Sequence, residues 1–280
     1  MKRLESALAA RDKYTAEGLL VELGELLPND PRIADYRRRV RALPGADRFV
    51  TITVGGSVTL ELVLVPPGKF VMGSNRTDSE KPLRTVQIAK SFYLGKYEVT
   101  QQQWETLMGS NPSYFKGPKN PVDQVTWDEC QLFVAKLNEK DNRFTFRLPS
   151  EAEWEYACRA GSTNDFCHGN SESALLEYAW FIANETGTSQ PVGRKKPNAW
   201  GFYDMHGNVW EWCQDIYHPS YDNAPADGSA RLDGATTNRV LRGGSWYSTA
   251  FAVRSANRGR APPTFRGVVY GFRVAATPKN

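Results

Sequence analysis

The sequence predicts an α+β protein in which an N-terminal helical hairpin precedes a loop-rich domain of short strands and two helices. Three observations carry this prediction. Apolar residues recur at helical spacing from Leu4 to Leu43. Short runs that alternate between apolar and polar residues follow, as in half-buried strands. The 8 Trp, 12 Tyr and 23 Gly among 280 residues indicate irregular backbone held in place by large rings.

The N-terminal segment, residues 1–45, predicts a tetratricopeptide-like helical hairpin that is too short to form a repeat array. Leucines mark the apolar face of its first helix: Leu4, Leu8, Leu19, Leu20, Leu23 and Leu27. The break at Pro28–Pro31 ends that helix, and Asp30 is expected to cap a second one with Pro31 at its first position. The hairpin is either an amphipathic arm that packs on the main domain or on another chain, or a receptor for a peptide. The Leu43–Asp47 stretch is typical of a linker, so the main domain is predicted to span residues 46–280.

Strand and helix boundaries in the main domain are marked by local signals. Alternating runs predict strands over Phe49–Val54 and Val58–Val65. The patterns Thr126–Glu129 and Ser150–Glu153 are capping boxes, in which a hydroxyl and a carboxylate satisfy free amides at a helix start. We expect these two helices to end near residues 138 and 159. Beyond residue 161 few segments are periodic.

Composition excludes several classes of protein. A net charge of +4 over 280 residues does not call for nucleic acid as a partner. No apolar run approaches the roughly 18 residues that a membrane span needs, and no signal-peptide pattern is present, so no membrane association is expected. Cys130, Cys158, Cys167 and Cys213 form no CxxC pair. A reducing, cytoplasmic location is therefore expected.

Several segments, taken together and in order, resemble the sulfatase-modifying-factor (formylglycine-generating-enzyme) family. They are Leu64–Ser74, Tyr97–Thr100, Pro121–Trp127, Arg147–Ala157, Pro197–Trp212, Arg242–Trp246 and Gly271–Val274. The resemblance covers roughly residues 50 to 278 and implies the C-type-lectin-like fold of that subclass. Most of these residues are expected to be scaffold, with Arg147 and Glu151 forming a buried ion pair.

The catalytic chemistry of the family is not expected here. Its oxidase members bind copper through two cysteines that follow a Gly-Gly-Ser-aromatic motif, and the matching positions are Ser248 and Val253. A hydroxyl and an isopropyl group cannot replace two soft thiolates, so copper is not expected. His168, His206 and His218 lie on separate loop segments, without the spacing of a helical metal pair. The sequence thus predicts a protein without enzymatic activity; the alternative is a divergent oxidase or related tailoring enzyme of the family.

A structural calcium ion is implied by the family at one segment. The matching residues are Asp204, Gly207, Val209 and Glu211, which offer two side chains and two carbonyl groups. Oxygen donors of mixed type suit a hard cation. The alternative is that Asp204 and Glu211 hydrogen-bond loop amides without an ion.

The segment 239–274 is similar to the variable region of proteins that diversity-generating retroelements diversify, where adenines of a template are copied unfaithfully. Its framework consists of residues 239–246, 254–258 and 271–274. The residues between are types that changes of adenine in an AAC codon can produce, and we predict that they bind the ligand: Tyr247, Ser248, Thr249, Phe251, Ala252, Gly259, Ala261, Pro262, Phe265, Gly267, Val268 and Tyr270. Aromatic residues among small, adaptable ones are typical of recognition surfaces. The alternative is that Phe251, Phe265, Val268 and Tyr270 belong to ordinary core strands.

Two further expectations follow. The arginines of this segment, Arg254, Arg258, Arg260 and Arg266, are expected to tie loops through carboxylates and carbonyls rather than bind phosphates. We therefore predict a non-catalytic, receptor-type binding protein whose unknown ligand is a protein. A third possibility is a sensory module that contacts a signalling partner through residues 1–45.

Overall fold

The computed structural model describes residues 1–9, 13–27, 30–42, 45 and 47–279, and the chain divides into two compact units, Met1–Val50 and Thr51–Asn280. The division falls a few residues beyond the predicted linker, of which Leu43, Pro44 and Ala46 lie outside the described residues. Within the described residues no helix is both long and apolar enough to cross a membrane.

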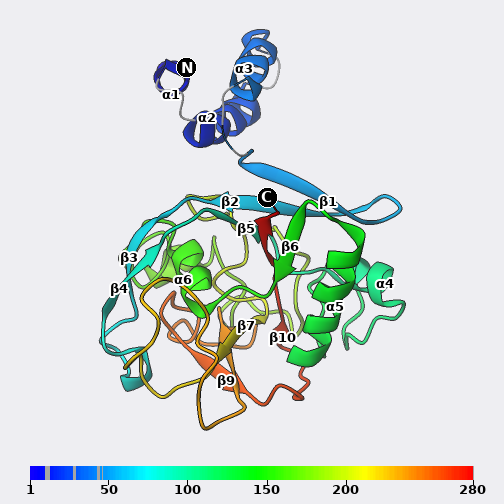
Figure 1. The fold of residues 1–280 in the computed structure, drawn as a ribbon, viewed down its shortest axis with the longest axis vertical. Coiled ribbons are helices and arrows are strands. Elements are labelled where there is room, and N and C mark those ends of the chain that lie inside the picture. Colours follow the sequence, from blue (N-terminus) through cyan, green and yellow to red (C-terminus); the bar gives the residue numbers. More distant parts are fainter. Residues whose placement is uncertain (10–12, 28–29, 43–44, 46, 280) are drawn as a thin grey trace. The chain divides into compact units, whose positions relative to one another are not determined.

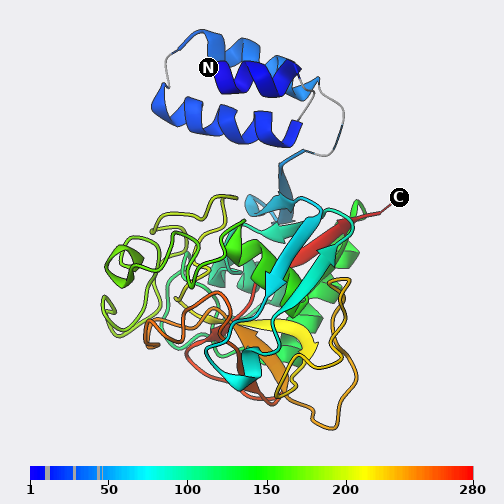
Figure 2. The same cartoon turned by 90° about the vertical axis from the view of Figure 1, so that its left-hand side faces the viewer.

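The smaller unit contains three helices, α1 (Lys2–Ala9), α2 (Lys13–Leu26) and α3 (Arg32–Arg41). Helix α2 contacts both of the others (Figure 2). Their shared core is made by Leu4, Leu8, Leu19, Tyr36 and Val40, among others. The prediction of two helices was wrong, because the leucine pattern from Leu4 to Leu27 is divided between α1 and α2, with Leu27 just after α2.

The start of α3 follows the predicted signal with a small shift. The Asp30 carboxylate accepts the Arg32 amide at 2.9 Å, as a capping residue would. Pro31, however, lies just before the helix instead of at its first position.

The larger unit has three sheets. The strands are β1 (Phe49–Gly55), β2 (Val58–Val65), β3 (Gly68–Met72), β4 (Arg84–Ile88), β5 (Phe92–Gly95), β6 (Phe144–Arg147), β7 (Trp210–Ile216), β8 (Arg239–Arg242), β9 (Gly259–Ala261), β10 (Tyr270–Gly271) and β11 (Ala275–Pro278). One sheet has the order β1-β2-β5-β11-β6, a second β10-β7-β8-β9, and β3 pairs with β4. Figure 1 shows the five-stranded sheet at one end of this unit and β7, β9 and β10 toward the other. This is the mixed, C-type-lectin-like architecture that the sequence predicts.

The helices of the larger unit are α4 (Gln101–Met108), α5 (Trp127–Lys140), α6 (Glu151–Arg159) and the short α7 (Glu172–Leu175), with a 3-10 turn at Asp78–Glu80. Both predicted capping boxes form: each hydroxyl accepts the amide three residues on, and each carboxylate accepts the amide of the capping residue. Helices α4 and α7 were not predicted. A third capping box, between Thr100 and Gln103, marks the start of α4 and was a signal that the sequence contained.

The four-stranded sheet determines how the segment 239–274 is held. Strand β8 opens this segment, β9 pairs with β8, and β10 pairs in parallel with β7. Two turn-rich stretches, residues 243–258 and 262–269, therefore lie between fixed strands. Beneath them the core of the unit is built around Trp154, Met205, Cys213 and Val240.

Candidate ligand-binding face

The residues predicted to contact a ligand lie mainly at the surface of the two turn-rich stretches. Tyr247, Phe251 and Phe265 are 66%, 50% and 47% exposed, although exposure of large rings to water is unfavourable. Eleven of the twelve predicted positions are exposed or partly exposed: Tyr247, Ser248, Thr249, Phe251, Ala252, Gly259, Pro262, Phe265, Gly267, Val268 and Tyr270. We refer to these eleven residues as the variable face. Because the rings of Phe251 and Phe265 are exposed, these two residues are not core.

Ala261 is the exception among the twelve. It pairs with Arg239 in the β9–β8 ladder and is only 5% exposed, so it is unable to contact a ligand as predicted. Gly259, at the other end of β9, is also restricted. A Cβ there would lie 3.0 Å from the Trp210 ring, so a larger residue requires that ring to move.

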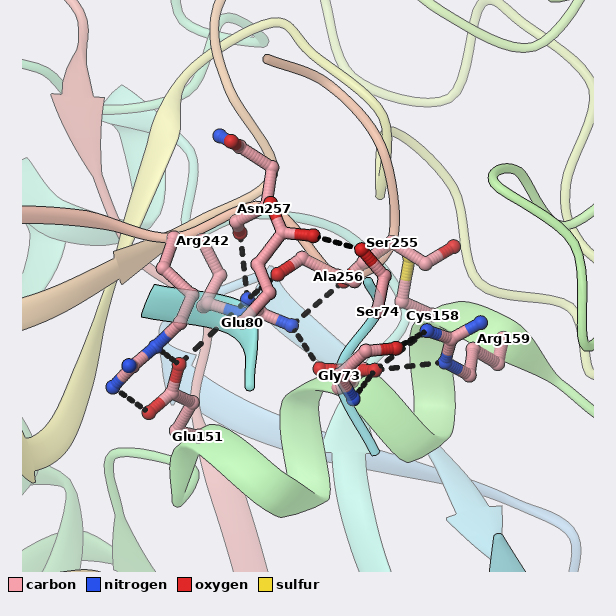
Figure 3. A network of polar contacts seen from close by, with 12 residues as sticks. Gly73, Ser74, Glu80, Glu151, Cys158, Arg159, Arg242, Ser255, Ala256 and Asn257 are labelled. Carbon is pink, nitrogen blue, oxygen red and sulfur yellow. Dashed lines mark hydrogen bonds and ion pairs between the residues drawn. The ribbon is translucent and has the colours of Figure 1, made fainter. Parts of the chain in front are cut away.

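Framework residues between the exposed positions are buried and ion-paired (Figure 3). The Arg242 guanidinium has no exposed surface; it donates to the Glu155 carboxylate at 2.5 Å and to the carbonyls of Ser255, Ala256 and Asn257. Burial lowers the pKa of Arg242, whereas the surrounding Tyr221, Glu155 and Glu151 raise it, and the net shift is upward. Arg242 therefore stays charged and holds the backbone that follows the first exposed stretch.

Arg254 and Arg258 hold the framework in the same way. Arg254 donates to both carboxylate oxygens of Glu80, at 3.0 and 2.7 Å, and Arg258 does so with Glu151 at 2.6 and 2.9 Å. Burial raises the pKa of Glu80. The hydrogen bonds from Arg254 and Ser74, together with the Arg254 charge, outweigh this effect, so that the pKa falls below its ordinary value. These bidentate pairs fix both ends of the 254–258 segment.

The predicted role of the arginines is thus confirmed for most of them and corrected in one detail. Arg266 donates to the Glu129 carboxylate and to the Gln124 carbonyl, whereas Arg260 is exposed and lies over the Tyr217 ring. The predicted Arg147–Glu151 pair was wrong. Arg147 pairs with Glu153, which is the carboxylate of the Ser150 capping box. Glu151 forms its ion pair with Arg258.

The two positions that match the family's copper ligands do not fit a copper ion. The Ser248 hydroxyl accepts the Ser245 amide at 3.0 Å, and Val253 is buried in a small apolar cluster with Phe166 and Phe181. The buried Cys158 thiol does not supply the missing thiolate. Burial raises its pKa to about 12, so it remains protonated.

The segment implied to bind calcium offers no free pair of carboxylates. Both Glu211 oxygens accept from the Arg273 guanidinium at 2.6 Å, and Trp154 donates to one of them at 2.7 Å. One Asp204 oxygen accepts the Gly193 amide at 2.7 Å, while the other is buried without a partner among the described residues. The Arg273 charge thus already balances Glu211, and the free carboxylate donor of the segment is the Asp204 oxygen without a described partner. Calcium binding at Asp204, Gly207, Val209 and Glu211 stays a prediction.

A loop outside the variable region also reaches this face, although no motif in its sequence predicts this role. Residues 109–124, called the fixed loop from here on, follow α4. The Phe115 ring packs edge-on against the Trp246 ring, with 6.2 Å between the ring centroids, next to Tyr247. Within the loop the buried Asp123 accepts the Tyr114 amide at 2.9 Å. A Tyr-Phe pair after a helix carries no recognisable binding motif, so only the structure identifies it.

Asp123 gives the fixed loop a testable pH dependence. Burial raises its pKa to about 6, although the Tyr114 amide and the Lys116 charge oppose this shift. One of its oxygens has no partner among the described residues. A raised folded-state pKa adds stability below the unfolded value near pH 4, and this contribution is lost as the pH rises through 6. In Asp123→Asn the contribution is absent. The difference in free energy of unfolding between wild type and variant is expected to change by on the order of 2 kcal/mol from pH 4 to 7, measured by urea denaturation. A difference that is constant with pH would contradict the assignment.

Comparison with known proteins agrees with this fold. Residues 56–278 match the family described as the sulfatase-modifying factor enzyme 1-like domain. The chain belongs to this family. Among solved structures of similar fold, PvdO from Pseudomonas aeruginosa shares 31% sequence identity with this chain at a TM-score of 0.75, over 83% of this chain and 99% of that one. Treponema denticola variable protein 1 shares 30% sequence identity at a TM-score of 0.72, over 83% of this chain and 100% of that one.

The sulfatase-modifying factor family also includes enzymes. The formylglycine-generating enzyme of Mus musculus is 27% identical over 77% of this chain and 75% of its own length. Several other curated relatives are longer proteins, and this chain spans less than half of their length. The chain is thus similar both to a variable protein and to enzymes, and its own site residues must distinguish the two.

Proposed function

We propose that this chain is a non-catalytic, receptor-type binding protein whose segment 239–274 is diversified by a retroelement to vary the specificity of the variable face. One observation carries the proposal: exposed residues of adaptable types alternate with buried, ion-paired framework residues. Tyr247 and Phe251 are exposed, whereas Arg242, which precedes them, and Arg254, which follows them, are buried. Such an arrangement lets the surface change while the fold is kept.

Two further points support the proposal. A similar solved structure is that of a variable protein, and the likeness extends over its whole length. The exposed rings and hydroxyls of the variable face provide contact area at low entropic cost, which suits a protein ligand. A cytoplasmic location and a protein ligand are part of the proposal.

The gene provides the direct test. We expect a near-copy of its 3′ end beside a reverse transcriptase gene, differing from it only opposite adenines of the copy. The differences should fall in the codons of the variable face and spare those of Arg242, Arg254 and Arg258. Differences spread evenly over framework and surface codons, or a gene that stands alone beside a sulfatase, would argue against diversification.

The alternative is an oxidase or tailoring enzyme, which the similarity to formylglycine-generating enzymes favours. Ser248 and Val253 oppose it, because they supply no thiolate at the copper positions. The purified chain is expected to leave a cysteine-containing peptide unchanged in the presence of copper and oxygen. Conversion of that peptide, followed by mass spectrometry and lost in His206→Ala, would establish the enzyme instead.

The smaller unit is proposed to contact a signalling partner. It has a core of its own, yet Leu26 and Leu27 at the end of α2 remain exposed. If this contact relays binding, removing residues 1–45 should abolish signalling but leave ligand binding unchanged. Loss of ligand binding on removal would contradict this division of roles.

A further inference from the structure

The fixed loop, residues 109–124, closes the gap between the two parts of the variable face. At one end the Phe115 ring packs edge-on against Trp246, the neighbour of Tyr247. At the other end the Gln124 amide donates to the Gly267 carbonyl at 3.0 Å, and Arg266 donates back to the Gln124 carbonyl at 2.9 Å. The loop thus touches residues of both turn-rich stretches, which the buried 253–256 segment otherwise separates.

Tyr114, near the middle of this loop, combines an exposed ring with a rigid backbone. Its side chain is 68% exposed. Its amide is held by Asp123, its ring meets Phe115 edge-on at 4.9 Å, and Gln101 from α4 donates to the Phe115 carbonyl at 2.8 Å. An aromatic ring that is already ordered loses little entropy on binding, which is the property of residues that dominate protein interfaces.

The charge around Tyr114 is positive. Lys116 and Lys119 of the fixed loop are exposed, whereas Asp123, the only acidic residue of the loop, is buried. The Val192 amide donates to the Lys119 carbonyl at 3.0 Å, which brings the chain leading to the exposed Arg194 alongside. Cations at the rim of an aromatic patch attract a partner of opposite charge and speed its association.

We infer that the fixed loop is a constant part of the binding face, with Tyr114 as an anchor and Lys116, Lys119 and Arg194 as a basic rim for an acidic surface of a polypeptide ligand. This inference rests on the proposed function. The variable face then selects among acidic partners, and every variant keeps the same anchor. A polypeptide is favoured over nucleic acid because this rim consists of three cations and the net charge of the chain is only +4.

The test uses the full chain and random linear peptides displayed on phage. Selected peptides are expected to combine Asp or Glu with apolar residues. Tyr114→Ala should weaken most of them about tenfold or more, as truncation of an interface anchor does. Leu232→Ala is the matched control, since Leu232 is 59% exposed on a loop away from these contacts, and it should change affinity less than twofold, roughly the limit for a neutral position. Unchanged circular dichroism of both variants verifies their folding.

A second variant tests the basic rim. Lys116→Glu combined with Lys119→Glu should slow association and reduce its dependence on salt, measured by surface plasmon resonance. Peptides weakened by Tyr247→Ala but not by Tyr114→Ala would overturn the constant anchor and leave the proposed function standing. Peptides insensitive to both would overturn the proposed function as well. Single-stranded DNA bound more tightly than any selected peptide, and lost in the lysine variant, would overturn the choice of a polypeptide.

Discussion

Replacing Arg242 with methionine is expected to lower the free energy of unfolding by about 3–5 kcal/mol. Methionine replaces the aliphatic part of the arginine side chain but carries no charge. The buried Glu155 carboxylate then keeps Arg159 but loses one of its two guanidinium partners, and three carbonyls lose a donor. Buried carbonyls without a donor, and a buried carboxylate with one cation fewer, lower the stability of the folded state. Urea denaturation monitored by tryptophan fluorescence measures the change.

Arg266→Met is the matched control for this substitution. Arg266 belongs to the same segment and also pairs with a glutamate, but its side chain is about half exposed. Solvent screens such a pair, so the expected loss is within about 1 kcal/mol. If the two variants lose equal free energy of unfolding, Arg242 does not stabilise the framework more than an exposed arginine does.

Gly207→Ala is expected to destabilise the chain by about 4 kcal/mol. Gly207 has a φ of 137°, which L-residues rarely adopt, and a Cβ there would lie 2.0 Å from the Trp180 carbonyl oxygen. That oxygen belongs to backbone, and the Asn208 amide already binds it at 2.8 Å, so it has no freedom to move away. Asn208 in turn accepts the Trp246 amide, which means that the turn at Gly207 also positions the start of the variable face.

Gly201→Ala separates the effect of backbone strain from the effect of the close contact with the Trp180 carbonyl. Gly201 has a φ of 89°, but no described atom beyond its immediate neighbours lies within 4 Å of its added Cβ. Only backbone strain of about 1–2 kcal/mol is expected there. Thermal unfolding of both variants checks this ranking, and a Gly207→Ala variant as stable as Gly201→Ala would contradict the close approach of Trp180.

The sequence was sufficient where the signal is local. The capping boxes at Thr126 and Ser150 form as predicted, because each involves residues three positions apart. The same argument would have found α4 from Thr100 and Gln103. The family resemblance predicted the C-type-lectin-like fold, which local patterns alone do not specify.

Pairings between distant residues were not predictable. Arg254 and Glu80 are 174 residues apart, and nothing near either of them indicates the other. The wrong Arg147–Glu151 assignment arose for this reason: several carboxylates follow Arg147 closely, and only the fold shows that Glu151 faces Arg258. Burial of Ala261 likewise depends on the β8–β9 pairing, and the exposure of Tyr114 on the bonds within its loop.

The buried arginines have a consequence at the level of the codon. If adenines of a template direct the changes, a residue keeps its identity in every variant when no adenine of its codon determines the amino acid. Arginine satisfies this condition in all four CGN codons, because three of them contain no adenine and the adenine of CGA lies at a silent third position. Lysine does not, since both of its codons begin with two adenines. Guanidinium groups at Arg242, Arg254 and Arg258 thus provide cations for Glu155, Glu80 and Glu151 that such copying leaves intact, and lysines at these positions would be lost from one generation of variants to the next.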